Sequence, residues 1–350
     1  SAEIDLARKH LGLARYTLTR LTGQPTEPVA EPDPDDRRFL AEDWHRHLSF
    51  DVLQQAYLIN SRAFLSWVEG MEGLPGPGRD QMLFYARQLT SALSPSNYPL
   101  TNPEVLRITW ERKGMNLVDG ARNLVDDIRQ NPNLFNVAMT DRSAFEVGGN
   151  LATTPGKVVY QNELMQLIQY SPTTETVARR PLLIVPPWIN KFYILDLTER
   201  NSFIRWLVDQ GQTVFMVSWR NPGPAQKNRG WDDYMTLGPL AAIDAVTEAT
   251  GEPQMNTIGY CIGGTLLGTT MAWLAKKQRN PIVSTTYLTT LMDFSDPGGI
   301  GVFISDHSLR GIERAMEKKG YLDGRAIAFT FNLLRENDLF WSYWTNNYLK

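Results

Sequence analysis

The stretch Thr257-Ile-Gly-Tyr-Cys-Ile-Gly-Gly-Thr265 decides the fold class of this chain of 350 residues. An apolar run precedes it at residues 255–258, and an amphipathic helical pattern follows it over residues 264–277. Gly-x-Cys-x-Gly at a strand-to-helix turn is the pattern of a nucleophile elbow, with cysteine in the place of serine. The sequence therefore predicts an α/β fold in which a sharp turn presents Cys261.

The residue types of this turn favour covalent catalysis by Cys261. Gly259 and Gly263 leave out side chains where the strand and the helix would otherwise collide. The start of a helix favours the thiolate, because its free N–H groups and the helix dipole stabilise negative charge. The amide of Ile262 would point at the acyl oxygen, as half of an oxyanion hole. A buried, inert cysteine in a glycine-rich turn is the competing interpretation.

Further strands and helices are expected on both sides of the elbow. The strand candidates are residues 158–160, 164–170, 181–185, 213–218, 255–258 and 282–290. Helical patterns near residues 200–210, 237–250 and 264–277 separate the later strands. Strands that alternate with helices predict a mostly parallel sheet with right-handed crossovers.

The loop after the strand expected at residues 181–185 is a second candidate segment. It reads Pro186-Pro-Trp-Ile-Asn190. In hydrolases with an elbow of this kind, the loop after the third strand supplies the second oxyanion amide. Ile189 is the expected donor and Asn190 the alternative. A turn that the two prolines merely stiffen is the competing interpretation.

Arg220 follows the strand expected at residues 213–218. Its guanidinium is suited to a phosphate or a carboxylate. An ion pair with Asp232 or Asp233 is the alternative that we prefer, since paired charges at a surface are common and usually have little effect.

A cysteine nucleophile needs a general base, normally a histidine that an acid orients. The 89 residues after Cys261 contain one histidine, His307. We interpret His307 as a surface or helix-cap residue, and we assign no catalytic role to Asp293, Asp296 or Asp306. The catalytic triad is therefore incomplete on the residues of this chain.

The N-terminal part of the sequence carries no such candidates. Residues 23–36 are acidic and proline-rich, which is typical of an extended, solvated linker. From residue 37 to about 130 the apolar spacing is helical, and Asn102-Pro-Glu104 has the pattern of a helix start. The expected divisions are an N-terminal helix with linker (1–36), a helical domain (37–150), an α/β core with the elbow (151–306) and the start of a helical cap region (307–350).

The composition excludes several classes of protein. Basic and acidic residues number 35 and 38 and are mixed along the chain, which argues against nucleic-acid binding. No apolar run approaches the roughly 18 residues that a membrane span needs, and we see no secretion signal. One cysteine permits no internal disulfide and fits a reducing compartment. With four histidines besides, neither a metal site nor an organic cofactor is expected.

Several long strings resemble the polyhydroxyalkanoate synthases, and within them the class I enzymes that make short-chain polyesters. The resemblance runs from about residue 92 to the end of the chain. It rests on residues 95–104 (PSNYPLTNPE), 185–197 (VPPWINKFYILDL), 218–222 (SWRNP), 259–264 (GYCIGG), and the strings Asn337-Asp-Leu and Asn347-Tyr-Leu-Lys350.

This resemblance implies a partial α/β-hydrolase-like core after an α-helical N-terminal domain. Family members polymerise (R)-3-hydroxyacyl-CoA, chiefly 3-hydroxybutyryl-CoA, into polyester and release CoA. They work as cytoplasmic homodimers on the surface of polymer granules. The match assigns the nucleophile to Cys261 and an oxyanion amide to Ile262. Because members continue past Asn-Tyr-Leu-Lys into a segment with the catalytic Asp and His, we expect this chain to be truncated at its C-terminus.

The chemistry of a thiol supports this interpretation. A thiol that attacks an acyl-CoA exchanges one thioester for another, so the acyl group stays activated for transfer to a hydroxyl. Two alternatives remain: a cysteine esterase or thioesterase of the same fold, and a non-catalytic granule-binding or dimerisation fragment that lacks the C-terminal Asp and His.

Overall fold

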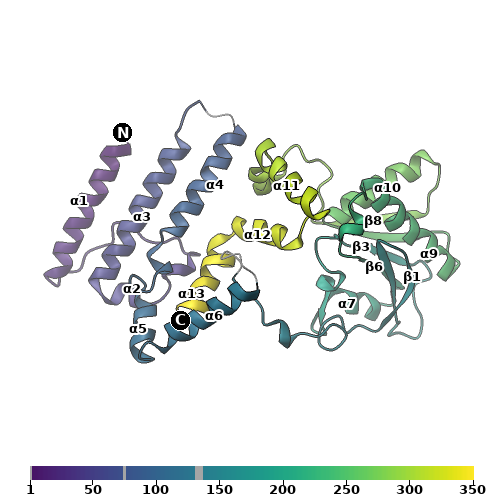
Figure 1. Ribbon diagram of the computed structural model, residues 1–350, viewed down its shortest axis with the longest axis horizontal. Helices are drawn as coiled ribbons and strands as arrows, with labels where there is room; N and C mark the ends of the chain where they lie inside the picture. Colours follow the sequence, from purple (N-terminus) through teal and green to yellow (C-terminus); the bar gives the residue numbers. More distant parts are fainter. Residues whose placement is uncertain (1, 74–75, 131–136) are drawn as a thin grey trace. The chain divides into compact units, whose positions relative to one another are not determined.

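The structure of the protein, a computed structural model, describes residues 2–73, 76–130 and 137–350. Its backbone contacts divide the chain into two compact units (Figure 1). The helical unit comprises Ser1–Thr140, Gly299–Ser305 and Arg325–Lys350, and the α/β unit comprises Asp141–Gly298 and Asp306–Gly324. This division differs from the boundaries expected from the sequence, because the C-terminal residues are shared between the two units.

Six strands form the main sheet of the α/β unit, in the order β1-β2-β6-β3-β7-β8. They are β1 (Gly156–Gln161), β2 (Met165–Tyr170), β3 (Leu182–Val185), β6 (Val214–Trp219), β7 (Met255–Tyr260) and β8 (Ile282–Leu288). β3 pairs in parallel with β6 and β7, and β7 pairs in parallel with β8. β2 runs antiparallel to both β1 and β6. The expected α/β fold with a mostly parallel sheet is confirmed.

Helices cover both faces of this sheet, which explains why all four residues of β3 are buried. α7 (Phe203–Asp209) packs on the face that presents Leu182 and Ile184. α8 (Trp231–Met235), α9 (Ala241–Thr250) and α10 (Ile262–Lys276) pack on the face that presents Leu183 and Val185. The alternation follows from the two-residue period of a strand. The unit also contains a short hairpin, β4 (Asp196–Thr198) and β5 (Asn201–Ser202), and the helix α11 (Asp306–Lys319).

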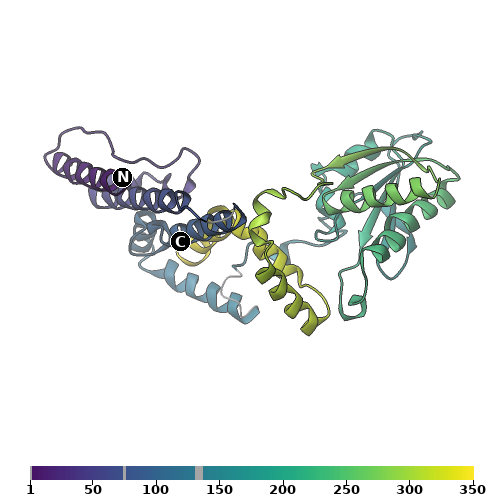
Figure 2. The ribbon, with the colours of Figure 1, turned by 90° about the horizontal axis from the view of Figure 1, so that it is seen from above.

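The helical unit is built from the N-terminal helices and from the end of the chain. Its helices are α1 (Ala2–Leu21), α2 (Asp43–Arg46), α3 (Leu48–Glu69), α4 (Gly76–Ala92), α5 (Pro103–Glu111), α6 (Met115–Gln130), α12 (Gly324–Leu334) and α13 (Ser342–Tyr348). α1 and α3 lie side by side (Figure 2). α5 begins as expected, because the side chain of Asn102 accepts hydrogen bonds from the amides of Glu104 and Val105. No helix in the described ranges is long and apolar enough to cross a membrane.

The acidic, proline-rich segment has the extended form expected of residues 23–36, and one part of it contacts the helices. The amide of Val29 donates to Oε1 of Gln55 at 2.7 Å. Val29 and Ala30 pack against the buried side chains of Leu13 and Ile59. Gln55, a buried polar side chain on α3, thus supplies an acceptor for this backbone, while no residue of the segment is itself fully buried.

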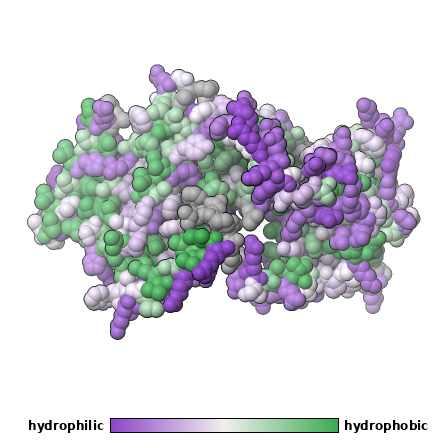
Figure 3. Space-filling view, in the orientation of Figure 1, coloured by the Kyte–Doolittle hydropathy of each residue, from purple (hydrophilic) through white to green (hydrophobic). Residues whose placement is uncertain are grey.

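Exposed apolar side chains gather on one side of α6. Leu117, Val118, Ala121 and Val125 line a shallow depression of about 700 Å³ together with charged side chains of the same helix. Figure 3 shows apolar surface over this part of the helical unit, beside a row of hydrophilic side chains. The opposite side of α6 packs on α13, where Gly120 lies directly against the backbone of Tyr348.

Candidate active site

Cys261 stands between β7 and α10 with φ 54° and ψ −131°. A positive φ is strained for a residue with a side chain, and such strain persists only where neighbouring contacts impose it. The amide of Cys261 donates to the carbonyl of Leu288 at 2.9 Å, and its carbonyl accepts from the amide of Gly264 at 2.9 Å. Hydrogen bonds at both its amide and its carbonyl thus fix the backbone of Cys261, which is half-buried.

The glycines of the turn permit close contacts between backbones. A Cβ on Gly259 would lie 2.5 Å from Cα of Gly264, and a Cβ on Gly263 would lie 2.4 Å from the carbonyl oxygen of Val185. Gly264, to which the sequence analysis assigned no role, is equally constrained, because a Cβ there would lie 2.2 Å from Oγ1 of Thr290. The signal for it was the doubled glycine after Cys261.

The amide of Ile262 is the first N–H of α10. The first amides of a helix have no acceptor within the helix. In the described part of the chain no other acceptor for it is found. This amide is therefore free to donate to a ligand next to Cys261.

The segment that follows β3, residues 186–196, is here called the β3 loop. Its two candidate donors, Ile189 and Asn190, are exposed, and their amides find no acceptor among the described residues. Nζ of Lys191 donates to Oδ1 of Asn221 at 2.8 Å, which ties this loop to the loop after β6. Because β3, β6 and β7 are parallel, the loops that follow them leave from the same edge of the sheet as Cys261.

Two residues that the sequence analysis missed hold the ends of the β3 loop. The indole N–H of Trp219 donates to the carbonyl of Pro186 at 2.7 Å. Oδ1 of Asp196 accepts from the hydroxyls of Thr154 and Ser202, both at 2.6 Å. The sequence did contain a signal for Asp196, because this acidic residue stands inside the apolar string Ile-Leu-Asp-Leu. Such a position predicts a buried carboxylate, and a buried carboxylate needs hydrogen-bond partners.

An aromatic cluster lies beside the beginning of this loop. Trp188 packs on Tyr234, Trp231 and Trp219, with ring centroids 4.9, 5.7 and 5.9 Å apart. Gly238 makes room for it, because a Cβ there would lie 2.3 Å from the ring of Trp219. Burial raises the pKa of Tyr234. The cluster gives this edge of the sheet an apolar wall.

The histidine and the three aspartates that follow Cys261 in the sequence make no hydrogen bond to it in the described structure. His307 is exposed in the first turn of α11. Asp293 and Asp296 accept hydrogen bonds from the amides two residues further on, and this bond lowers the pKa of Asp293. Asp306 is exposed at the start of α11. In the described ranges no hydrogen bond joins any of these residues to Cys261. No group of three or more His, Cys, Asp or Glu side chains that could hold a metal ion is found among the described residues.

Among the described residues no ion pair joins Arg220 to Asp232 or to Asp233. Asp233 instead accepts from the guanidinium of Arg229 at 3.1 Å and from the amide of Gly230 at 2.9 Å. These two bonds lower the pKa of Asp233. No hydrogen bond from the guanidinium of Arg220 is found within the described residues, so its alternative role at a phosphate or carboxylate stays a prediction.

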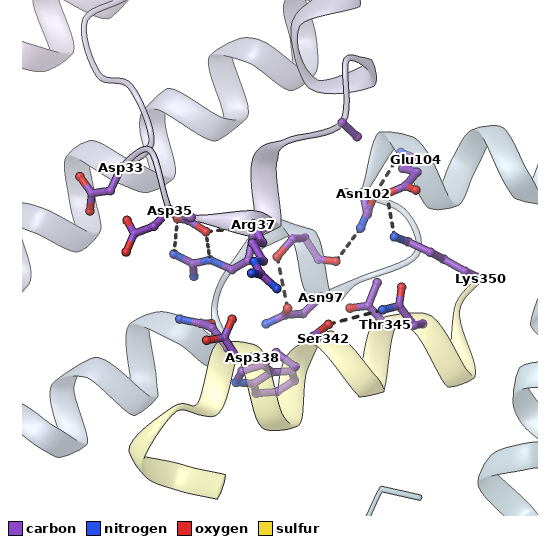
Figure 4. Close-up of a pocket in the computed structure, with 17 residues that line it drawn as sticks. Asp33, Asp35, Arg37, Asn97, Asn102, Glu104, Asp338, Ser342, Thr345 and Lys350 are labelled. Atoms are coloured by element: carbon purple, nitrogen blue, oxygen red, sulfur yellow. Dashed lines mark hydrogen bonds and ion pairs between the residues drawn. The ribbon is translucent and has the colours of Figure 1, made fainter. Parts of the chain in front are cut away.

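A polar cavity of about 420 Å³ lies within the helical unit (Figure 4). Charged pairs form part of its wall: Arg38 bonds Asp36 at 2.8 Å, and Lys350 bonds Glu104 at 2.7 Å. Because these charges neutralise one another, we assign the cavity no chemistry.

Tyr170, near Asp196, allows a test of how much a buried hydroxyl without a partner contributes to stability. Its hydroxyl is buried and unpartnered in the described structure, and burial and the charge of Asp196 raise its pKa. Tyr170→Phe should change the free energy of unfolding by less than about 1 kcal/mol, because no hydrogen bond is lost. Tyr16→Phe should cost about 1–3 kcal/mol, since the hydroxyl of Tyr16 donates to buried Asp51 at 2.5 Å. Hydrogen exchange resolved by peptide measures each unit separately, and equal losses would contradict this reading.

Two family models match parts of this chain. The model of the poly-beta-hydroxybutyrate polymerase (PhaC) N-terminus matches residues 35–207, and that of the alpha/beta hydrolase fold matches residues 181–300. A solved structure of a probable hydrolytic enzyme from Pseudomonas aeruginosa is 15% identical, with a TM-score of 0.31, and the match covers 56% of this chain and 66% of that one.

Curated relatives match 90–100% of this chain. A poly(3-hydroxyalkanoate) polymerase from Methylorubrum extorquens is 47% identical over 349 residues, which are 100% of this chain and 58% of that protein. Its counterpart subunit from Rhizobium meliloti is 46% identical over 100% of this chain and 57% of its own length. The counterpart from Cupriavidus necator is 41% identical over 90% and 54%. The chain, which spans a little over half the length of these relatives, belongs to the poly(3-hydroxyalkanoate) polymerase family.

Proposed function

We propose that the protein polymerises (R)-3-hydroxyacyl-CoA, chiefly 3-hydroxybutyryl-CoA, into polyester with release of CoA. The observation that carries this proposal is Cys261 at a strained strand-to-helix turn, next to a free helix-terminal amide, in a chain 47% identical to a polymerase of this kind. The growing acyl chain is held as a thioester on Cys261.

The proposed reaction begins when Sγ of Cys261 attacks the thioester carbonyl. A new carbon–sulfur bond forms, the bond to the CoA sulfur breaks, and the thiol proton passes through a general base to the departing CoA thiolate. The hydroxyl of another acyl unit then attacks the cysteine thioester. An ester bond forms as the bond to Sγ breaks, and the hydroxyl proton returns through the base to sulfur.

In each step negative charge develops on the acyl oxygen. We assign the donors to the amide of Ile262 and to that of Ile189, with Asn190 as the alternative. The free state of these amides supports this assignment, because donors that need no reorganisation stabilise the transition state most. That the base and the acid lie outside this chain stays a prediction, as does the surface role of His307.

The family also suggests the oligomeric state and the cellular location of the protein. We propose a cytoplasmic homodimer on the surface of polyester granules, without nucleic acid, metal or organic cofactor. CoA enters as part of the substrate and leaves as a product.

Product analysis of the protein, purified as its native host makes it, tests the proposal. With (R)-3-hydroxybutyryl-CoA we expect CoA release together with an insoluble polyester. CoA release with free hydroxy acid as the only product would instead establish a cysteine thioesterase of the same fold. If no CoA is released and mass spectrometry finds no acyl group on Cys261, the chain is a non-catalytic granule-binding or dimerisation module.

A further inference from the structure

The β3 loop is fixed at both ends by buried polar contacts, while the amides of Ile189 and Asn190 between these ends find no acceptor among the described residues. Its first residue, Pro186, also lies against the elbow, because a Cβ on Gly263 would be 2.5 Å from the carbonyl oxygen of Pro186. The orientation of this carbonyl therefore sets how the loop leaves β3 beside Cys261.

The first anchor is Trp219 at the end of β6. Its indole N–H donates to the carbonyl of Pro186 at 2.7 Å, and the side chain is only 8% exposed. The ring is held in place by the aromatic cluster and by close contact with Gly238. Because the ring is locked, its N–H holds the peptide plane between Pro186 and Pro187 in one orientation.

The second anchor is Asp196 at the end of the loop. Its side chain is 1% exposed, and Oδ1 receives two hydroxyl hydrogen bonds at 2.6 Å, from Thr154 and Ser202. Its carbonyl accepts from the amide of Ala152 at 3.0 Å. The hydroxyl of Ser202 in turn caps α7 by accepting from the amide of Arg205 at 2.8 Å. Asp196 thus joins the loop to a separate segment and to the start of a helix.

We propose that Trp219 and Asp196 are positioning residues for acyl transfer, which hold the β3 loop so that one of its free amides meets the acyl oxygen at Cys261. This inference rests on the proposed function. Neither side chain needs to touch the substrate: each acts through the loop. A misplacement of about 1 Å far from the reacting atoms can slow a reaction about 100-fold, so both anchors should affect kcat rather than substrate binding.

Trp219→Phe tests the first anchor in the protein as its native host makes it. It removes the N–H while it keeps an aromatic ring. We expect kcat for CoA release to fall about 10- to 100-fold with KM unchanged. Trp273→Phe is the matched control, because Trp273 packs on the same core from α10 and no hydrogen bond of its indole is found in the described structure. It should keep the original kcat.

The rate at which iodoacetamide alkylates Cys261 distinguishes a displaced β3 loop from a general loss of structure in the Trp219→Phe variant. That reaction displaces iodide and develops no oxyanion, so it needs the thiol but not the β3 loop. The rate of alkylation should stay unchanged in Trp219→Phe. A fall in alkylation that equals the fall in kcat would overturn the inference, because the variant would then have lost the elbow itself.

Thr154→Val tests the second anchor without a change of shape. It removes one of the two hydroxyls that bond Asp196, and we expect a fall of about 3- to 10-fold in kcat with normal alkylation. Thr173→Val is its control, since Thr173 bonds exposed Asp209 at 2.7 Å away from the loop. Unchanged kcat in both anchor variants would refute the inference while the proposed function stands. An unsubstituted protein that releases no CoA would refute the proposed function itself.

Discussion

Cys261→Ala should reduce CoA release from (R)-3-hydroxybutyryl-CoA by at least about 10⁴-fold. Without Sγ no covalent intermediate can form, and the free amide of Ile262 has no attacking atom to assist. Loss of the thioester absorbance in the ultraviolet measures the rate directly, without a thiol reagent that would itself react with Cys261. Mass spectrometry should find an acyl group on the unsubstituted protein and none on the variant.

Cys261→Ser is the matched control, because it keeps a side chain of similar size at φ 54°. An oxygen nucleophile would form an oxyester, which discards the activation of the thioester before chain growth. We expect slow release of CoA with little polymer for each CoA released. Full CoA release by Cys261→Ala would show that the assignment of Cys261 as nucleophile is wrong.

Gly263→Ala should lower the free energy of unfolding of the α/β unit by about 3 kcal/mol. The new Cβ would meet the carbonyl oxygens of Val185 and Pro186 at 2.4 and 2.5 Å. Both oxygens belong to backbone, and one of them also accepts the bond from Trp219, so neither can move without cost. Hydrogen exchange of the α10 and β3 peptides in increasing denaturant measures this loss.

Gly268→Ala is the control in the same helix. Its Cβ would meet the end of the Met292 side chain, with Cε at 2.6 Å, and a flexible side chain can turn away. Alanine also favours a helix over glycine by about 1 kcal/mol, so the net change should be close to zero. Equal destabilisation by both substitutions would contradict the argument from backbone contact.

Some of the candidate site could be predicted because its signal is local. The elbow occupies a few consecutive residues, and the glycines beside Cys261 are needed by the turn itself. The loop after β3 was expected to carry an oxyanion donor, which stays a prediction; the amides of Ile189 and Asn190 find no acceptor among the described residues. The choice between them could not be made from the sequence, because it depends on where the acyl oxygen lies.

Other features could not be predicted, because their partners are distant in the sequence. Pro186 and Trp219 are 33 residues apart, and Thr154 and Asp196 are 42 apart. The proline-rich composition predicted an extended segment at residues 23–36, but not that the amide of Val29 donates to Gln55 on α3. Polar residues carry no local mark that separates a solvated side chain from a buried one with partners.

The class of fold, the position of Cys261 at a strand-to-helix turn, and the family could all be predicted from the amino-acid sequence. These follow from local periodicity, from turn chemistry and from long strings of residues, which need no knowledge of distant contacts. The strand order, the division of residues 307–350 between two units, and the anchors of the β3 loop became apparent in the folded structure. The physical reason is that hydrogen bonds and close backbone contacts between distant segments exist only once the chain has folded.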